Sequence, residues 1–140
     1  MKVDYARADD LEAFERVAAA FAAELRPGEV VALAGDLGAG KTTFVRAVVR
    51  ALHGSDQATS PTFTFRHRYT GEPPIEHLDL YRIEDPAEAV ELGLEEAFDG
   101  KSIVLVEWPE RLPHLIPEHS IHVGIAGAGD SPRDLVFERR

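Results

Sequence analysis

Residues 35–42 constrain the fold of this chain more than any other stretch, because they read Gly-Asp-Leu-Gly-Ala-Gly-Lys-Thr. The pattern G-x-x-x-x-G-K-T is typical of a phosphate-binding loop. Glycines let such a loop curl until its backbone N–H groups point at phosphate oxygens. An apolar run at 30–34 precedes the loop and a helix-forming run at 42–49 follows it. This strand–loop–helix context predicts an α/β fold of the P-loop nucleotidase class.

The polar residues of the loop have expected tasks. Lys41 should reach the outer phosphates of a nucleotide, and the hydroxyl of Thr42 should bind Mg²⁺. The helix that begins here adds the partial positive charge of its N-terminus to the same site. The residues expected to hold the nucleotide in this stretch are Gly35, Asp36, Gly38, Ala39, Gly40, Lys41, Thr42 and Thr43.

The composition is that of a soluble globular protein of 140 residues with a net charge of −10. A chain of this length is expected to form one domain, residues 1–140. The absence of cysteine excludes disulfides and thiolate metal sites. No apolar run is as long as a membrane helix and the N-terminus does not read as a signal peptide, so we expect a cytoplasmic location. The acidic surface disfavours broad binding of nucleic acid and suits a basic protein partner.

The remaining sequence alternates between helix and strand signals. Asp9 is expected to cap the first helix, with Glu12 as the reciprocal partner of a capping box. Alternating residues at 63–69 and an apolar run at 75–81 flank a turn, which predicts an antiparallel hairpin and therefore a mixed central sheet with flanking helices. The expected elements are a helix from Asp9 to Leu25 with Leu11 on its apolar face, a strand at 29–34, a helix at 41–53, strands at 63–69 and 75–81, short helices between Asp85 and Phe98 divided at Gly93, a strand at 102–107, and a hairpin of 120–125 with 133–138.

Two carboxylates stand at the ends of expected strands. Four apolar residues precede Glu107, which is the Walker B pattern of a buried parallel strand. Ligand sites of open α/β sheets lie at the carboxyl ends of the strands. Glu107 can therefore face Thr42 across a Mg²⁺ ion, directly or through water. Asp79 ends the strand at 75–81 and is a candidate for positioning water or metal, with a surface acid as the alternative.

Other polar residues have more than one interpretation. The hydroxyls of Thr59, Ser60 and Thr62 are candidates for sensing the γ-phosphate, but a solvated linker has the same composition. Trp108 could be a packed wall, a nucleotide contact or a partner anchor. Arg133 follows a glycine-rich loop that could lie near the adenine, with the arginine stacked on the ring. The six histidines show no metal-ligand spacing, so a structural or surface role is expected for all of them.

The order of these motifs resembles a known family. The loop at 35–43 is followed by Ser-Pro-Thr-Phe at 60–63, by His-Leu-Asp-Leu-Tyr-Arg at 77–82, and by Glu-Trp at 107–108. Together they are similar to the bacterial TsaE family, also called YjeE, over nearly the whole chain. Proteins of that family are cytoplasmic ATPases that act with TsaB and TsaD. They are needed to make threonylcarbamoyladenosine (t6A) beside the anticodon of tRNAs that read codons starting with A.

The resemblance implies roles for residues that match its motifs. It implies that the segment around Thr62 is a switch-like loop and that Trp108 responds to nucleotide or partner. It also implies that adenine lies between the early helix and the C-terminal hairpin, where Ala8 stands in place of the Ser or Thr of many relatives. The implied site residues are Lys41, Asp79 and Glu107 for catalysis, Thr42 and Glu107 for Mg²⁺, and Thr62, Trp108 and Arg133 for the nucleotide.

The expected function is that of a Mg²⁺-dependent ATPase subunit of the t6A machinery, which hydrolyses ATP to ADP and phosphate to drive the cycle of a TsaB–TsaD complex. Contact with tRNA is expected to be indirect or local. Turnover without partners should be slow, because no arginine is obviously placed as a finger and Arg82 is the best candidate. One alternative is a small-molecule P-loop kinase, which the lack of an arginine-rich lid disfavours. Another is a nucleotide-dependent switch without useful hydrolysis, where the absent N-K-x-D motif argues against GTP.

Overall fold

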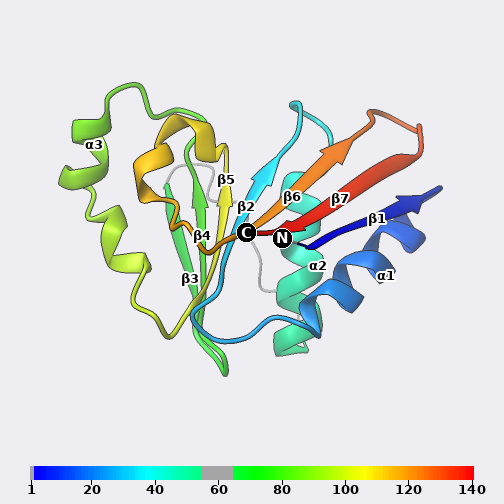
Figure 1. The fold of residues 1–140 in the computed structure, drawn as a ribbon, viewed down its shortest axis with the longest axis horizontal. Coiled ribbons are helices and arrows are strands. Elements are labelled where there is room, and N and C mark those ends of the chain that lie inside the picture. The colour runs from blue at the N-terminus through cyan, green and yellow to red at the C-terminus, as the bar shows by residue number, and fades with distance from the viewer. Residues whose placement is uncertain (1, 55–64) are drawn as a thin grey trace.

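The computed structural model describes residues 2–54 and 65–140 of the chain. Within these residues, seven strands form one sheet in the order β1-β7-β6-β2-β5-β4-β3 (Figure 1). The strands are β1 (Lys2–Ala8), β2 (Val30–Ala34), β3 (Arg66–Tyr69), β4 (Ile75–Asp79), β5 (Ile103–Glu107), β6 (Ile121–Ala126) and β7 (Arg133–Arg139). The helices are α1 (Leu11–Ala22), α2 (Lys41–His53) and α3 (Pro86–Glu91), with the 3₁₀ turns η1 (Leu94–Ala97), η2 (Pro109–Arg111) and η3 (Pro113–Leu115).

The sheet is mixed, as the two expected hairpins require. β2 lies between β5 and β6 and runs parallel to both, and β4 runs parallel to β5. The hairpins β3–β4 and β6–β7 add antiparallel strands on either side of this parallel centre. The predicted α/β fold with a mixed sheet and flanking helices is confirmed.

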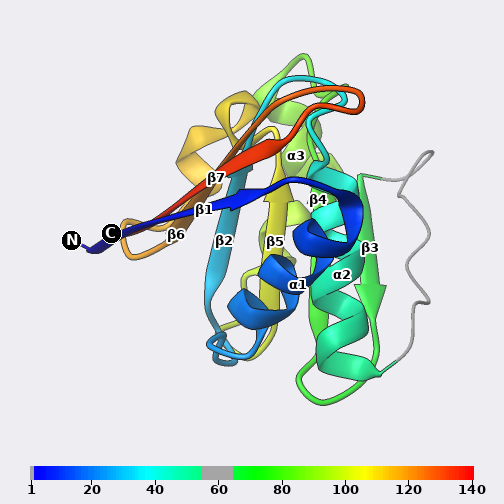
Figure 2. The same ribbon diagram turned by 90° about the vertical axis from the view of Figure 1, so that its right-hand side faces the viewer.

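The core has two layers, one on each face of the sheet. α1 and α2 pack together on one face, and α3 with the 3₁₀ turns covers the other (Figure 2). Successive side chains of a strand point to opposite faces. In β5, Ile103 and Leu105 accordingly join the α1–α2 layer, whereas Val104 and Val106 join the α3 layer. This explains why β5 is apolar at every position rather than at every second one.

Three details at the N-terminal side differ from the sequence prediction. β1 was not predicted, because it is an exposed edge strand in which only Val3 and Tyr5 alternate with charged residues, and its antiparallel pairing with β7 defines it. The cap of α1 is Asp10, whose carboxylate accepts a 2.8 Å hydrogen bond from the backbone N–H of Ala13. Asp9 instead pairs with Arg7, its neighbour at the end of β1. Leu11, expected in the core, is 61% exposed in the first turn of α1.

The region after β4 matches its sequence signals closely. Asp85 and Glu88 form a capping box around the start of α3, and Gly93 adopts a left-handed conformation (φ 65°) that separates α3 from η1. Such a backbone favours glycine, because a Cβ atom is strained there. No helix in the two described ranges is long and apolar enough to span a bilayer.

Candidate functional site

The loop between β2 and α2 has the backbone that phosphate binding requires. Gly38 and Gly40 both have a positive φ, at 85° and 112°, which only glycine adopts without strain. A Cβ atom on Gly40 would also lie 3.3 Å from the ring of Phe14. Gly40 is the N-cap of α2, so the capping residue itself offers no side chain to the first N–H groups of that helix. These N–H groups and the helix dipole are suited to bind an anion.

Lys41 lies buried beneath this loop. Its ammonium group donates a hydrogen bond to the carbonyl of Gly35 and sits 3.6 Å from the centre of the Trp108 ring. Burial lowers the pKa of Lys41, and the negative charges of Glu107, Glu110, Asp79 and Asp36, in that order, oppose the shift. The site therefore gathers negative charge around the buried ammonium of Lys41.

Glu107 meets the start of α2 at the carboxyl end of the parallel strands. The register pairs Glu107 with Leu33 on one side and with Asp79 on the other. The Thr42 hydroxyl lies 3.1 Å from each carboxylate oxygen of Glu107 and donates to that group. Mg²⁺ prefers oxygen ligands and commonly takes only one or two from the protein. Thr42 and Glu107 are thus a chemically suitable pair for this ion, although no cluster of three acidic or histidine ligands exists among the described residues.

Asp79 is the second carboxylate of this cluster and is half-buried beside Glu107. Burial raises the pKa of Asp79. The backbone N–H of Tyr81, at 3.1 Å from Oδ1, opposes that shift, and the negative charge of Glu107 adds to it. A carboxyl group beside the expected phosphate site is placed to position a water molecule.

Trp108 covers the cluster from the side of η2. Its backbone is left-handed, with φ 58°, and it is the only such non-glycine residue in the described part of the chain. That conformation costs a bulky residue on the order of 1–3 kcal/mol and is found mainly where a site requires it. The Trp108 ring packs at 4.8 Å from the half-exposed ring of Tyr81 and against the ammonium of Lys41. Trp108 therefore contacts both the inner lysine and the outer surface of the site.

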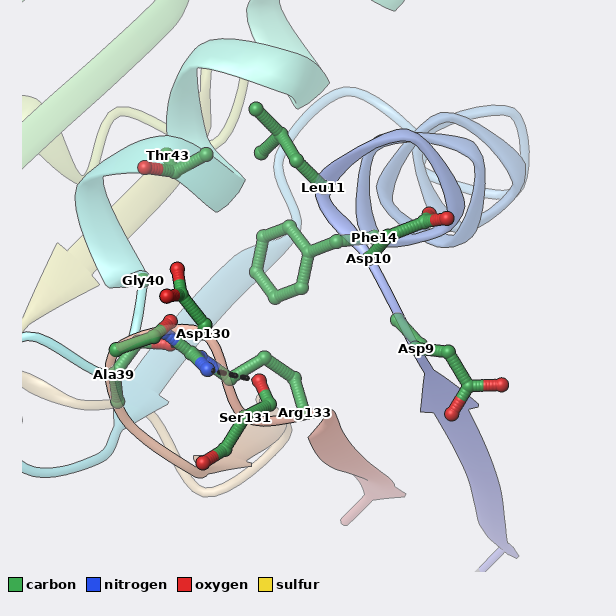
Figure 3. Close-up of a pocket in the computed structure, with 12 residues that line it drawn as sticks. Asp9, Asp10, Leu11, Phe14, Ala39, Gly40, Thr43, Asp130, Ser131 and Arg133 are labelled. Atoms are coloured by element: carbon green, nitrogen blue, oxygen red, sulfur yellow. Dashed lines mark hydrogen bonds between the residues drawn. The ribbon is translucent and has the colours of Figure 1, made fainter.

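A separate cavity of about 380 Å³ lies beside the loop, between the start of α1 and the β6–β7 loop (Figure 3). Arg133 closes one wall, and its guanidinium donates to the carbonyls of Ala39 (2.8 Å), Ser131 (2.5 Å) and Gly129 (3.1 Å). One side chain thereby ties the β6–β7 loop to the P-loop. The remaining lining comes from the start of α1, the P-loop and the β6–β7 loop, namely Ala8, Asp9, Asp10, Leu11, Phe14, Gly40, Thr43 and Asp130.

The structure brings most of the expected site residues into two groups. Lys41, Thr42, Asp79, Glu107 and Trp108 lie together on one side of the loop. Ala39, Gly40, Thr43 and Arg133 line the separate cavity. The hydroxyl candidates Thr59, Ser60 and Thr62 lie outside the described residues, and Arg82 is exposed to solvent.

One further residue, not among the predicted site residues, lies with the first group. For His77 a structural or surface role is expected, and the structure places it buried, with its Nε2 2.6 Å from Oε2 of Glu107. A signal did exist, because His77 precedes Asp79 by two residues in a strand and must point to the same face. Periodicity cannot reveal the partner on β5, which is 30 residues further along the chain.

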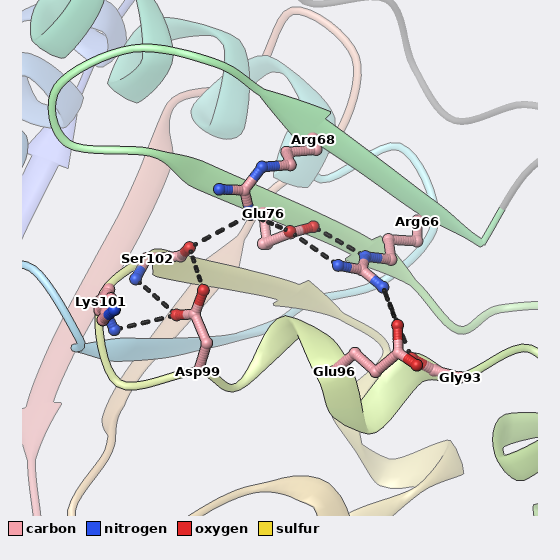
Figure 4. A network of polar contacts seen from close by, with 8 residues as sticks. All are labelled: Arg66, Arg68, Glu76, Gly93, Glu96, Asp99, Lys101 and Ser102. Atoms are coloured by element: carbon pink, nitrogen blue, oxygen red, sulfur yellow. Dashed lines mark hydrogen bonds and ion pairs between the residues drawn. The ribbon is translucent and has the colours of Figure 1, made fainter.

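A second buried charge lies on the other face of β4 (Figure 4). Glu76 is fully buried and accepts from Arg66 Nε and Nη2 at 2.9 Å and from Arg68 Nη1 at 2.7 Å. Arg66 also reaches Glu96 of η1 at 3.6 Å. This network holds the edge strand β3 to β4 and η1, away from the P-loop.

Comparisons with known proteins identify the family. The model of the family "Threonylcarbamoyl adenosine biosynthesis protein TsaE" matches residues 8–135. The chain belongs to the TsaE family. The resemblance read from the motif order is thus confirmed, and the TsaE match includes the P-loop, β4, β5 and most of the terminal hairpin.

Individual TsaE relatives match over most of their length. The "tRNA threonylcarbamoyladenosine biosynthesis protein TsaE" of Bacillus subtilis is 40% identical over 92% of this chain and 79% of its own. The protein of the same name from Rickettsia bellii is 43% identical over 87% of this chain and 85% of its own. Among solved structures, the crystal structure of Bacillus subtilis YdiB superposes with a TM-score of 0.80 at 34% identity, covering 99% of this chain and 86% of that one.

The raised pKa of Asp79 predicts a pH-dependent effect of Asp79→Asn. Burial favours the neutral carboxyl, so wild type loses folding free energy as pH rises from the unfolded pKa of about 4 through the higher folded value. The asparagine variant is spared this loss. Thermal melts should give D79N a higher melting temperature than wild type at neutral pH, and the two melting temperatures should become equal below about pH 4.

Asp99 provides a control of opposite sign. Hydrogen bonds from the backbone N–H groups of Ser102 and Lys101 lower the pKa of this exposed carboxylate. Asp99→Asn should therefore be less stable than wild type at neutral pH and equal to it in acid. If D79N remained more stable than wild type below about pH 4, the stability difference could not be due to ionisation of Asp79.

The network around Glu76 predicts a large effect of Glu76→Gln on folding. The exchange removes the charge that two arginines share, and we expect the free energy of unfolding to fall by about 2 kcal/mol or more. Glu12→Gln is the matched control, because Glu12 pairs with Arg16 at 3.2 Å on an exposed helix surface. Denaturant unfolding should show a change below about 0.5 kcal/mol for E12Q. Equal effects of the two variants would refute the structural role of Glu76.

Proposed function

We propose that this chain is the Mg²⁺-dependent ATPase of the bacterial t6A modification machinery, where it hydrolyses ATP to ADP and phosphate to drive the cycle of a TsaB–TsaD complex. The main support is the contact of the Thr42 hydroxyl, at the end of the P-loop, with both carboxylate oxygens of Glu107. The names of its relatives support the pathway, since they are called tRNA threonylcarbamoyladenosine biosynthesis proteins.

The nucleotide would span both sides of the P-loop. The phosphates would meet the N–H groups at the start of α2, where the N-cap Gly40 has no side chain to occupy them. Lys41 would exchange its hydrogen bond to the Gly35 carbonyl for one to the outer phosphates, keeping the Trp108 ring beside it. The cavity bounded by Phe14 and Arg133 would take the adenine, and its volume of about 380 Å³ is within the range of small-molecule sites.

The hydrolysis would take place beside the carboxylates of Glu107 and Asp79. Thr42 and Glu107 would hold Mg²⁺, which would supply neutralisation of charge on the phosphate oxygens. Asp79 would orient the attacking water through its Oδ2 oxygen, since Oδ1 accepts from Tyr81. Trp108 and Tyr81 would limit the access of bulk water from the η2 side. These residues position the reactants, which is the main task of the protein in phosphoryl transfer.

A protein partner would complete the site in the cytoplasm. Arg82, the best candidate for an arginine finger, is exposed and belongs to the turn that follows β4. A partner could press this arginine, or one of its own, toward the phosphates. The net charge of −10 favours a protein with a basic surface over direct contact with tRNA.

Lys41→Ala should abolish tight ATP binding, because it removes the only cation buried against the loop among the described residues. We expect at least about a 100-fold rise in the Kd measured by calorimetry, as for a lost charged hydrogen bond to phosphate. Lys101→Ala is the matched control, since Lys101 lies exposed in the turn before β5. Unchanged ATP affinity in K41A would refute the assignment of the P-loop.

A product assay distinguishes the ATPase from its alternatives. Wild type should release free phosphate slowly from ATP, and Glu107→Gln should lower the rate by about 100-fold or more, as for other lost electrostatic stabilisers. Adding TsaB and TsaD should raise the wild-type rate. A phosphorylated metabolite in place of free phosphate would favour a kinase, and binding without any release would favour a switch. Equal rates with and without partners would refute activation by the complex.

A further inference from the structure

His77 is held between two strands in a position that packing alone does not explain. It lies on β4 with 1% of its surface exposed, and its Nε2 is 2.6 Å from Oε2 of Glu107. Its other ring nitrogen, Nδ1, is buried and has no hydrogen-bond partner within the described part of the chain. An apolar side chain would fill the same space without burying an unsatisfied nitrogen. The contact with Glu107 is therefore what distinguishes a histidine here.

The contact also sets the tautomer of the ring. An ionised carboxylate can only accept hydrogen bonds, so the proton of His77 lies on Nε2 and is donated to Glu107. Glu107 then receives two donors from different elements, Thr42 from α2 and His77 from β4. His77 lies within the sheet and donates to Oε2 alone, whereas the Thr42 hydroxyl lies equally near both carboxylate oxygens.

We propose that His77 is a positioning residue, which fixes the rotamer of Glu107 so that a carboxylate oxygen stays directed at the divalent-cation site beside Thr42. The inference rests on the proposed function, because it assigns His77 a task only if Glu107 binds the metal. Groups that hydrogen-bond to a metal ligand typically change the metal affinity by 10- to 100-fold when they are removed. His77 thus tunes the affinity for the cation without touching nucleotide.

Replacing His77 by asparagine or by glutamine distinguishes the effect of its hydrogen-bond donor from the effect of its size. The amide nitrogen of glutamine can reach the position of Nε2, whereas that of asparagine reaches only about as far as Nδ1. His77→Gln should therefore retain the hydrogen bond to Glu107, and His77→Asn should lose it. His122→Asn is the control, because His122 is half-buried on β6 and bonds to Ser120 at 2.9 Å.

The experiment measures Mn²⁺ binding to the protein–ADP complex by the EPR signal of free Mn²⁺. We expect the Kd of Mn²⁺ to rise about 10- to 100-fold in H77N and to stay within about threefold of wild type in H77Q and H122N. ADP binding in EDTA should be the same in all four proteins. Should H77N not fold, His77→Leu provides the same loss of the donor.

Three results would overturn the role of His77, and the first two are wild-type Mn²⁺ affinity in H77N or H77L and a loss in H77Q as large as theirs. A loss of ADP binding in EDTA along with the Mn²⁺ affinity would also overturn it, because it indicates general damage to the site. If wild type itself bound ADP but no Mn²⁺, the proposed function would fail, and this inference with it. The first two results leave the proposed function intact.

Discussion

The parallel pairing of β2 with β5 is the constraint on which the site depends. It sets Leu33 beside Glu107, so the strand that leads into the P-loop and the strand that ends in the carboxylate finish at the same level. β4 joins β5 in the same direction and brings Asp79 to that level too. Each of these strands is covered on both faces, and their apolar burial holds the polar ends in register.

The alternation of β4 separates its structural charge from the charge of the site. Glu76 points to the α3 side and is neutralised by two arginines, which fasten the edge strand β3. His77 and Asp79 point to the side of the P-loop, where Lys41 is the nearby cation. Buried charge is costly unless it is paired. On β4, Glu76 meets this condition through its two arginines, whereas His77 and Asp79 lie on the face that suits ligand binding.

Much of the fold could be predicted because its signals are local. The P-loop, the capping box at Asp85 and the turns of both hairpins are read from a few adjacent residues, and all appear in the structure. β1 was not predicted in this way, since its apolar alternation is limited to Val3 and Tyr5 and its side chains are mostly exposed. The choice of Asp10 over Asp9 as the cap depends on where β1 ends, and the exposure of Leu11 depends on the cavity beside it.

By itself, the sequence determined the identity of the phosphate loop, the strands around it and the carboxylates at their ends, because spacing along the chain encodes each of these. Only the tertiary structure decided which side chains meet across strands. The contacts of His77 with Glu107, of Lys41 with Trp108 and of Arg133 with Ala39 join residues that are 30, 67 and 94 positions apart. Such contacts follow from strand order and register, which are properties of the packed sheet and leave no periodic trace in a single sequence.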